Sequence, residues 1–272
     1  NIDEMKQADT MAQFFACFVD VGSFPEKERY ENGYAYVKKM MERMRKEVEN
    51  FSQEIVFARN GEEIEKNRKA GKISALLTVE EGGVLNGKIE RVEELWSMGI
   101  RLITILWNYE NCIGYPNSER SEIMRKGLKQ FGFEVVEKMN ERKMLVDVSH
   151  LSDGGFWDVV KTSKCPVVAS HSNAREICPH PRNLTDEMIR ALAEKGGVIG
   201  INFYPRFIRK NKKANVEDIV THIRHIVNIG GIESVCIGTD FDGFSGESIE
   251  IERAGQMYLL YNTLKSAGFT EK

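Results

Sequence analysis

The residues that could do chemistry stand directly after apolar runs of the sequence. Four acidic or imidazole side chains share this position: Glu80, His150, His171 and Asp240. A carboxylate and two imidazoles are a suitable ligand set for zinc or a similar divalent ion, and a further carboxylate can transfer protons. The spacing therefore predicts a metal-dependent site, built where the ends of the apolar runs meet.

Two of these positions have an equally plausible neighbour. Glu81 is adjacent to Glu80, and the alternation of side chains along a strand turns only one of them inward. Asp242 raises the same question for Asp240, because Asp-Phe-Asp-Gly alone is typical of a turn. The residues themselves leave both pairs open.

Of the other three histidines, His222 and His225 receive no role, and for His180 loop exposure and a function are equally plausible. His180 lies in a proline-containing turn, whereas His222 and His225 are expected to be solvated or to flank the apolar face of one helix. A lone histidine at a strand end is more often structural than functional, but two of five at this position favour a function. The chain has no G-x-G-x-x-G, P-loop or G-x-S-x-G motif, so nothing supports nucleotide binding or serine hydrolysis.

The elements that must position these residues alternate between strands and helices. Near-continuous apolar runs are typical of parallel strands that are covered on both faces. Seven such runs occur, at 12–19, 73–79, 101–107, 144–149, 166–170, 197–203 and 234–239. Amphipathic helices separate them, and Thr185 and Asn215 are the expected N-caps of two helices. In a parallel barrel the carboxyl ends of all strands converge on one face, where active sites are built.

The composition is that of one globular domain over residues 1–272, with 42% hydrophobic and 29% charged residues. The net charge of -3 gives no basic excess for nucleic acid, and no apolar stretch approaches the ~20 residues that span a bilayer. The five cysteines are scattered without a C-x-x-C pair, which predicts free thiols. We therefore expect a reducing compartment and a cytoplasmic location.

Several motifs in order resemble the membrane (renal) dipeptidase family of zinc peptidases: LLTVEEGG, VDVSH, PVVASHS, the turn Pro181-Arg182-Asn183, VIGINFY and IGTDFDG. The resemblance covers essentially the whole chain. It implies a (β/α)8 TIM barrel of the metal-dependent hydrolase (amidohydrolase) type, with two zinc ions bridged by a glutamate. It also implies hydrolysis of dipeptides by a hydroxide that bridges the two ions.

The resemblance assigns roles residue by residue. Glu80 would be the bridging carboxylate, and His150 and His171 would hold one zinc ion together with it. Arg182 would bind the C-terminal carboxylate of the substrate. Asp240 would meet the free amino group of the substrate and serve in proton transfer.

Two departures from the family pattern concern the site. The family places a His-x-Asp zinc-binding pair on a first strand upstream of the run 12–19, but no histidine precedes His150. We therefore expect that the first strand is missing and that both ends of the sequence are trimmed. Better-known members also place a histidine, which can polarise the scissile carbonyl, where this chain has Trp107-Asn108. Either Asn108 hydrogen-bonds the substrate instead, or another group polarises the carbonyl. The role of Trp107 stays open.

The sequence thus predicts a zinc-dependent dipeptidase that acts on small dipeptides, with a homodimer as the oligomer considered. Two alternatives stay open: hydrolysis of another amide such as an N-acyl amino acid, and a catalytically inactive barrel that binds a metal or a peptide. The residues upstream of Asn1 would separate the inactive barrel from the enzyme.

Overall fold

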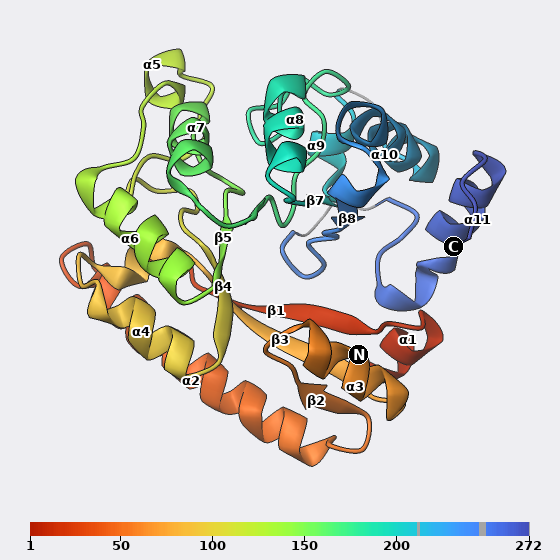
Figure 1. Ribbon diagram of the computed structural model, residues 1–272, viewed down its shortest axis with the longest axis horizontal. Helices are drawn as coiled ribbons and strands as arrows, with labels where there is room; N and C mark the ends of the chain where they lie inside the picture. Colours follow the sequence, from red (N-terminus) through yellow and green to blue (C-terminus); the bar gives the residue numbers. More distant parts are fainter. Residues whose placement is uncertain (211–212, 245–248, 272) are drawn as a thin grey trace. The chain divides into compact units, whose positions relative to one another are not determined.

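The computed structural model describes residues 1–210, 213–244 and 249–271. Its contacts form two compact units, one of Thr10–Cys165 and one of Asn1–Asp9 with Pro166–Lys272. Parallel strands alternate with helices in each unit (Figure 1). The expected α/β fold with parallel strands is confirmed, and the single domain over 1–272 stays a prediction.

The first unit is built on five parallel strands: β1 Ala12–Phe18, β2 Ile55–Phe57, β3 Ile73–Glu80, β4 Ile100–Thr104 and β5 Leu145–Asp147. β3 pairs with β1 along its whole length, with β2 at its beginning and with β4 at its end. β5 pairs with the other side of β4. The register aligns Glu80 with Thr104 and Thr104 with Asp147, so three polar side chains form a row at the carboxyl edge of the sheet.

Helices follow the strands of this unit and bury apolar stripes. Val37 and Met41 of the second helix are fully buried, as are Val135 and Met139 of the sixth. These residues belong to the helical stripes that the sequence pattern predicts. The helices are α2 Arg29–Asn50, α3 Gly61–Lys69, α4 Glu90–Ser97, α5 Ser121–Met124, α6 Gln130–Glu141 and α7 Asp153–Thr162, with 3-10 turns η1 Val21–Ser23 and η2 Gly82–Leu85.

The second unit holds the strands β6 Val167–Val168, β7 Ile199–Ile201 and β8 Val235–Ile237. β7 pairs in parallel with β8, and the bridge from Ala169 to Ile199 places the end of β6 beside β7. Its helices are α1 Ile2–Gln7, α8 Asp186–Glu194, α9 Pro205–Ile208, α10 Val216–Gly230 and α11 Tyr258–Ser266, with 3-10 turns η3 Ile232–Ser234 and η4 Ala254–Gln256.

Helix capping in this unit follows the sequence signals. The Thr185 hydroxyl accepts from the amide of Met188 at the start of α8, and Asn215 forms a capping box with Asp218 at the start of α10. Both predicted N-caps are confirmed. Each cap satisfies amide donors that have no partner within the helix.

Two glycines let the strands of this unit close on the end of β6. A Cβ atom on Gly200 would lie 1.9 Å from the carbonyl oxygen of Ser170, and one on Gly238 would lie 2.0 Å from the same oxygen. Only glycine permits this approach. The backbone directly before His171 is therefore packed against the main chain of β7 and the residue after β8.

The strands differ in length from the predicted apolar runs, and the structure adds one strand. All seven apolar runs contain a strand, and β2 lies between the first two runs, where none was expected. Trp107, which closes the third apolar run, lies beyond β4. No described helix is long and apolar enough to cross a membrane. None of the five cysteines forms a disulfide in the described part of the chain.

Candidate metal centre

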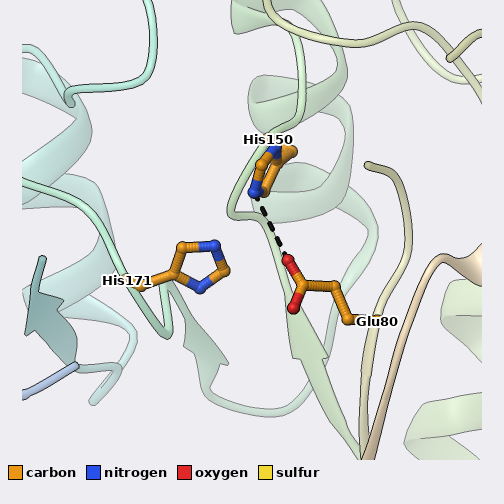
Figure 2. A group of neighbouring side chains, drawn as sticks. All are labelled: Glu80, His150 and His171. Carbon is orange, nitrogen blue, oxygen red and sulfur yellow. Dashed lines mark ion pairs between the residues drawn. The ribbon is translucent and has the colours of Figure 1, made fainter. Parts of the chain in front are cut away.

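Glu80 and His150 face each other at the carboxyl edge of the first sheet. Glu80 is the last residue of β3, and His150 follows β5 by three residues. His150 Nε2 lies 3.4 Å from Glu80 Oε1, and the two side chains are only 10% and 13% exposed (Figure 2). A carboxylate and an imidazole from different strands thus meet in a largely water-excluded place.

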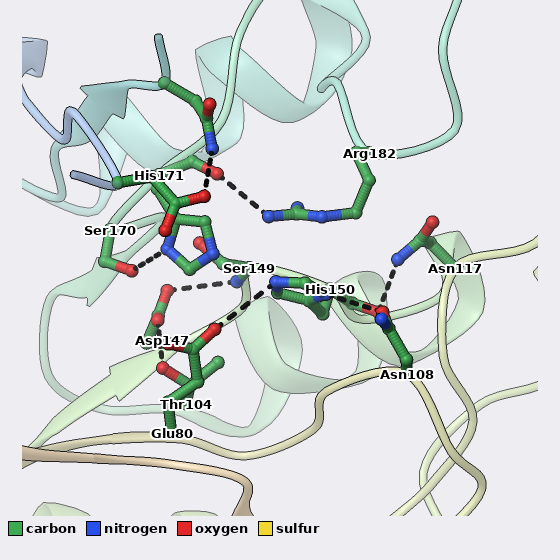
Figure 3. Close-up of polar contacts among 12 residues, drawn as sticks. Glu80, Thr104, Asn108, Asn117, Asp147, Ser149, His150, Ser170, His171 and Arg182 are labelled. Atoms are coloured by element: carbon green, nitrogen blue, oxygen red, sulfur yellow. Dashed lines mark hydrogen bonds and ion pairs between the residues drawn. The ribbon is translucent and has the colours of Figure 1, made fainter. Parts of the chain in front are cut away.

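His150 is held by two asparagines. Its Nδ1 lies 3.0 Å from Asn108 Oδ1, and its carbonyl oxygen accepts hydrogen bonds from the backbone amide (2.7 Å) and Nδ2 (2.9 Å) of Asn117 (Figure 3). The backbone of His150 has φ of +69°, a left-handed conformation. That conformation turns the chain sharply after β5.

The donor atoms of Glu80 and His150 fit a divalent cation. Zinc ligands lie ~2.0–2.2 Å from the ion in a tetrahedral arrangement, so two of them are about 3.3–3.6 Å apart. The observed 3.4 Å between Nε2 and Oε1 matches that spacing. A carboxylate oxygen and an imidazole nitrogen are also both among the ligands that bind zinc in proteins.

The polar row beside this pair fixes the ends of two strands. Asp147 is fully buried and accepts a hydrogen bond of 2.6 Å from the Thr104 hydroxyl and one of 3.0 Å from the amide of Ser149 (Figure 3). These bonds tie β4 to the turn that leads into His150. Asp147 therefore stabilises the backbone from which His150 projects.

The structure distinguishes Glu80 from Glu81. Glu81 is fully buried, and its Oε1 accepts from the amide of Gly83 at 2.6 Å and from Asn111 Nδ2 at 2.7 Å. Burial raises the pKa of Glu81 to about 7. Its φ of +115° directs the chain into η2. Glu80 therefore faces the imidazole of His150, while Glu81 braces the following turn.

In the second unit, His171 follows β6 and is 7% exposed. Its Nδ1 lies 2.7 Å from the hydroxyl oxygen of Ser170. Arg182 is also buried: its Nη2 donates to the carbonyl oxygen of His171 at 3.1 Å, and its guanidinium lies 5.3 Å from the ring centre of Phe207. The structure thus brings His171 and Arg182 together.

Asp240 stands after β8 in a left-handed conformation with φ of +61°. Its Oδ2 accepts from Asn202 Nδ2 at 3.1 Å. Asn202 is fully buried and exchanges hydrogen bonds of 3.0 Å with Asn173, through the amide and the carbonyl of its backbone. Asp242, by contrast, is exposed. Asp240 is therefore the aspartate of this turn that the buried polar network holds.

Asn202 was missed by sequence reasoning, and His222 was predicted only in part. Asn202 lies within the apolar run 197–203, and an asparagine at the carboxyl end of such a run is the available signal. His222 is not solvated, which was one of the two expectations; it belongs to the buried face of α10. It is fully buried, with Nδ1 accepting from the amide of Ala174 at 3.1 Å and Nε2 lying 2.9 Å from the carbonyl oxygen of Ile208.

Comparison with known proteins identifies the family. A sequence model described as "Membrane dipeptidase (Peptidase family M19)" matches residues 1–272. The chain belongs to the membrane dipeptidase family. It is accordingly a metallo-dipeptidase, and the resemblance stated from its motifs is confirmed.

Two curated sequences are relatives of this chain. An uncharacterized protein in the pqqA 5′ region of Klebsiella pneumoniae is 33% identical over 219 residues, which are 77% of this chain and 79% of that protein. An uncharacterized dipeptidase of Schizosaccharomyces pombe is 31% identical over 249 residues, or 88% of this chain and 60% of that protein. The aligned region thus spans three fifths of the yeast protein.

Solved structures share the fold. A metallo peptidase from Rhodobacter sphaeroides, liganded with a phosphinate mimic of the dipeptide L-Ala-D-Ala, superposes with a TM-score of 0.89. The match has 22% identity and covers 100% of this chain and 84% of that one. At this identity the likeness shows the fold.

Proposed function

We propose that this membrane dipeptidase family member is a zinc-dependent hydrolase of dipeptides, in which Glu80, His150 and His171 hold one ion. Each of the three residues offers one ligand atom, a carboxylate oxygen or an imidazole nitrogen. The observation that carries the proposal is the 3.4 Å separation of His150 Nε2 and Glu80 Oε1. Two strand ends hold these atoms at the spacing of two ligands on one zinc ion.

Zinc would supply a Lewis acid that lowers the pKa of water and polarises the scissile carbonyl. The family resemblance further predicts a second ion that shares Glu80. The number of ions per chain is part of the proposal and is tested by metal analysis.

Arg182 is proposed to bind the C-terminal carboxylate of the dipeptide. A guanidinium presents a planar fork that matches a carboxylate, and burial strengthens such a charge-assisted contact. The bond from Arg182 to the carbonyl oxygen of His171 fixes where that fork lies. A substrate that ends one residue after the scissile bond would pair with it, whereas a longer peptide would not.

Asp240 is proposed to bind the free amino group and to transfer the proton. Asn202 Nδ2 donates a hydrogen bond to Oδ2 of Asp240, and this bond orients the carboxylate. We assign Oδ1 to accept a proton from the attacking water and to return it to the leaving amine. The phosphinate dipeptide mimic bound by the Rhodobacter sphaeroides metallo peptidase supports dipeptides as the substrate class.

The test combines metal analysis with substrate profiling. The purified full chain is dialysed after loading with zinc, and the metal is counted by mass spectrometry for wild type, His150→Ala and His171→Ala. Hydrolysis is then measured for a free dipeptide, its C-terminal amide and an N-acetyl amino acid. His225→Ala is the matched control, because His225 is paired with Asp186 on α8 and has no place in the proposed site.

We expect wild type and His225→Ala to retain zinc and to cleave the free dipeptide best. His150→Ala and His171→Ala should lose zinc while remaining folded. Faster hydrolysis of the N-acetyl amino acid than of the free dipeptide would mean that the enzyme is a hydrolase of another amide. Zinc without hydrolysis would indicate a binding protein, and undiminished zinc in both histidine variants would refute the ligand assignment.

A further inference from the structure

The imidazole of His150 has a different partner at each nitrogen. Nε2 faces Glu80 Oε1 at 3.4 Å, and Nδ1 faces Asn108 Oδ1 at 3.0 Å. A neutral imidazole has one N–H donor and one acceptor nitrogen, and an amide oxygen is only an acceptor. Nδ1 must therefore carry the proton if it bonds to Oδ1 of Asn108. In the neutral imidazole, the lone pair of His150 is then on Nε2, the nitrogen left for a metal ion.

Asn108 is well placed for this task because the segment before it is anchored. Ile105 and Leu106 are fully buried, and the amide of Ile105 donates to the carbonyl oxygen of Asp147 at 3.3 Å. That bond extends the pairing of β4 with β5 beyond the end of β4. Asn108 and His150 therefore lie on neighbouring chain segments of one unit.

The backbone of His150 does not depend on Asn108. Asn117 binds the carbonyl oxygen of His150 through two donors, and neither donor touches the ring. The indole of Trp107 lies beside the imidazole of His150, with the two ring centres 6.2 Å apart. Of these three neighbours, Asn108 is the one that bonds to a ring nitrogen.

We propose that Asn108 is a positioning residue that holds the neutral His150 ring in the tautomer with its proton on Nδ1, so that the Nε2 lone pair is available to a cation shared with Glu80. Partners of this kind orient metal-binding histidines, and their loss typically weakens metal affinity by 10–100-fold. The inference rests on the proposed function for its zinc-binding consequence. The tautomer itself is measurable without any metal.

The experiment compares wild type, Asn108→Leu, Asn108→Asp and Asn117→Ala as full chains. Leucine removes the acceptor, aspartate keeps it, and alanine at 117 loosens the His150 backbone without touching the ring. Long-range proton–nitrogen NMR of histidine-labelled, metal-free protein at pH 8 reports which ring nitrogen of His150 is protonated. His150→Ala assigns its signals, and zinc affinity is measured by competition with a chromophoric chelator.

We expect protonated Nδ1 in wild type, Asn108→Asp and Asn117→Ala, and a mixture of tautomers in Asn108→Leu. Zinc should bind about 10–100-fold more weakly to Asn108→Leu, and Asn108→Asp should restore most of the affinity. A neutral wild-type ring with its proton on Nε2 and none on Nδ1, or an unchanged tautomer in Asn108→Leu, would overturn the inference. The expected tautomers without zinc binding in wild type would support Asn108 as the positioning residue and refute the proposed function instead.

Discussion

The guanidinium of Arg182 donates to the carbonyl oxygen of His171 over 3.1 Å, although 11 residues separate them in the chain. The side chain proposed to bind the substrate is therefore bonded to the backbone of a proposed metal ligand. Placement of the substrate carboxylate and placement of the imidazole are coupled by this one bond.

Arg182→Ala should lower kcat/KM for a free dipeptide by about 2–4 kcal/mol, because a buried charge-assisted contact with the substrate carboxylate is lost. That corresponds to roughly a 30- to 900-fold loss. Activity on the C-terminal amide of the same dipeptide should fall much less. Equal losses on both substrates would place Arg182 outside substrate binding, and zinc content measured in parallel reports any displacement of His171.

Asn202→Leu should reduce kcat about tenfold, since Asp240 loses the amide that orients its carboxylate and general acid–base steps depend on such placement. The double variant with Asp240→Ala should be no slower than Asp240→Ala alone. This cycle measures the coupling between the two side chains. Additive losses would show that Asn202 acts independently of Asp240.

Zinc should raise the thermal stability of the chain, because it binds the folded form. Free zinc at 100 times its Kd contributes about 2.7 kcal/mol, which is several degrees in Tm for a protein of this size. The increment is the difference in Tm with zinc and with a chelator. His171→Ala should abolish it and His225→Ala should keep it; an intact increment in His171→Ala would contradict the ligand assignment.

His222 should make stability depend on acidic pH. Burial lowers the pKa of His222 below its usual 6.5, repulsion from His225 adds to this, and the bond to Ile208 and the charge of Asp218 act in the opposite direction. The unfolded chain then binds more protons at this residue than the folded one. The contribution of neutral His222 is complete above about pH 6.5 and is lost as the pH falls below it.

His222→Gln has no titrating group and should therefore flatten this part of the profile. Thermal melts of wild type and His222→Gln between pH 8 and pH 5 provide the measurement. A parallel decline of Tm in the two proteins below pH 6.5 would assign the acid sensitivity to other groups.

The sequence pattern predicted the strands well, but it did not predict their lengths. The apolar run 101–107 continues past β4, whose last register partners with β5 are Thr104 and Asp147. β2 was missed because its three residues lie between charged helices, where neither length nor alternation marks a strand. Hydropathy reports burial, whereas strand ends are decided by pairing.

Glu80 and His150 could be predicted as neighbours because they stand at strand ends, and the topology of one sheet brings both to its carboxyl edge. Asn202 and His222 were beyond this reasoning. The partners of Asn202 are 29 and 38 residues away, and those of His222 are 48 and 14 residues away. Such contacts depend on tertiary packing, which no local pattern contains. The choice between Glu80 and Glu81 likewise depended on the side-chain contacts of each residue.

Backbone conformation and chemistry favour different amino acids at positions 150 and 240. Both residues have left-handed φ angles, which cost most side chains roughly 1 kcal/mol and glycine almost nothing. Selection for the stability of the fold alone would favour glycine at both positions. On the proposed function, a histidine and an aspartate at these positions serve the chemistry at some cost in the stability of the fold. Substitutions meant to stabilise the fold should therefore avoid positions 150 and 240, because glycine there would raise stability but remove the side chains that the activity needs.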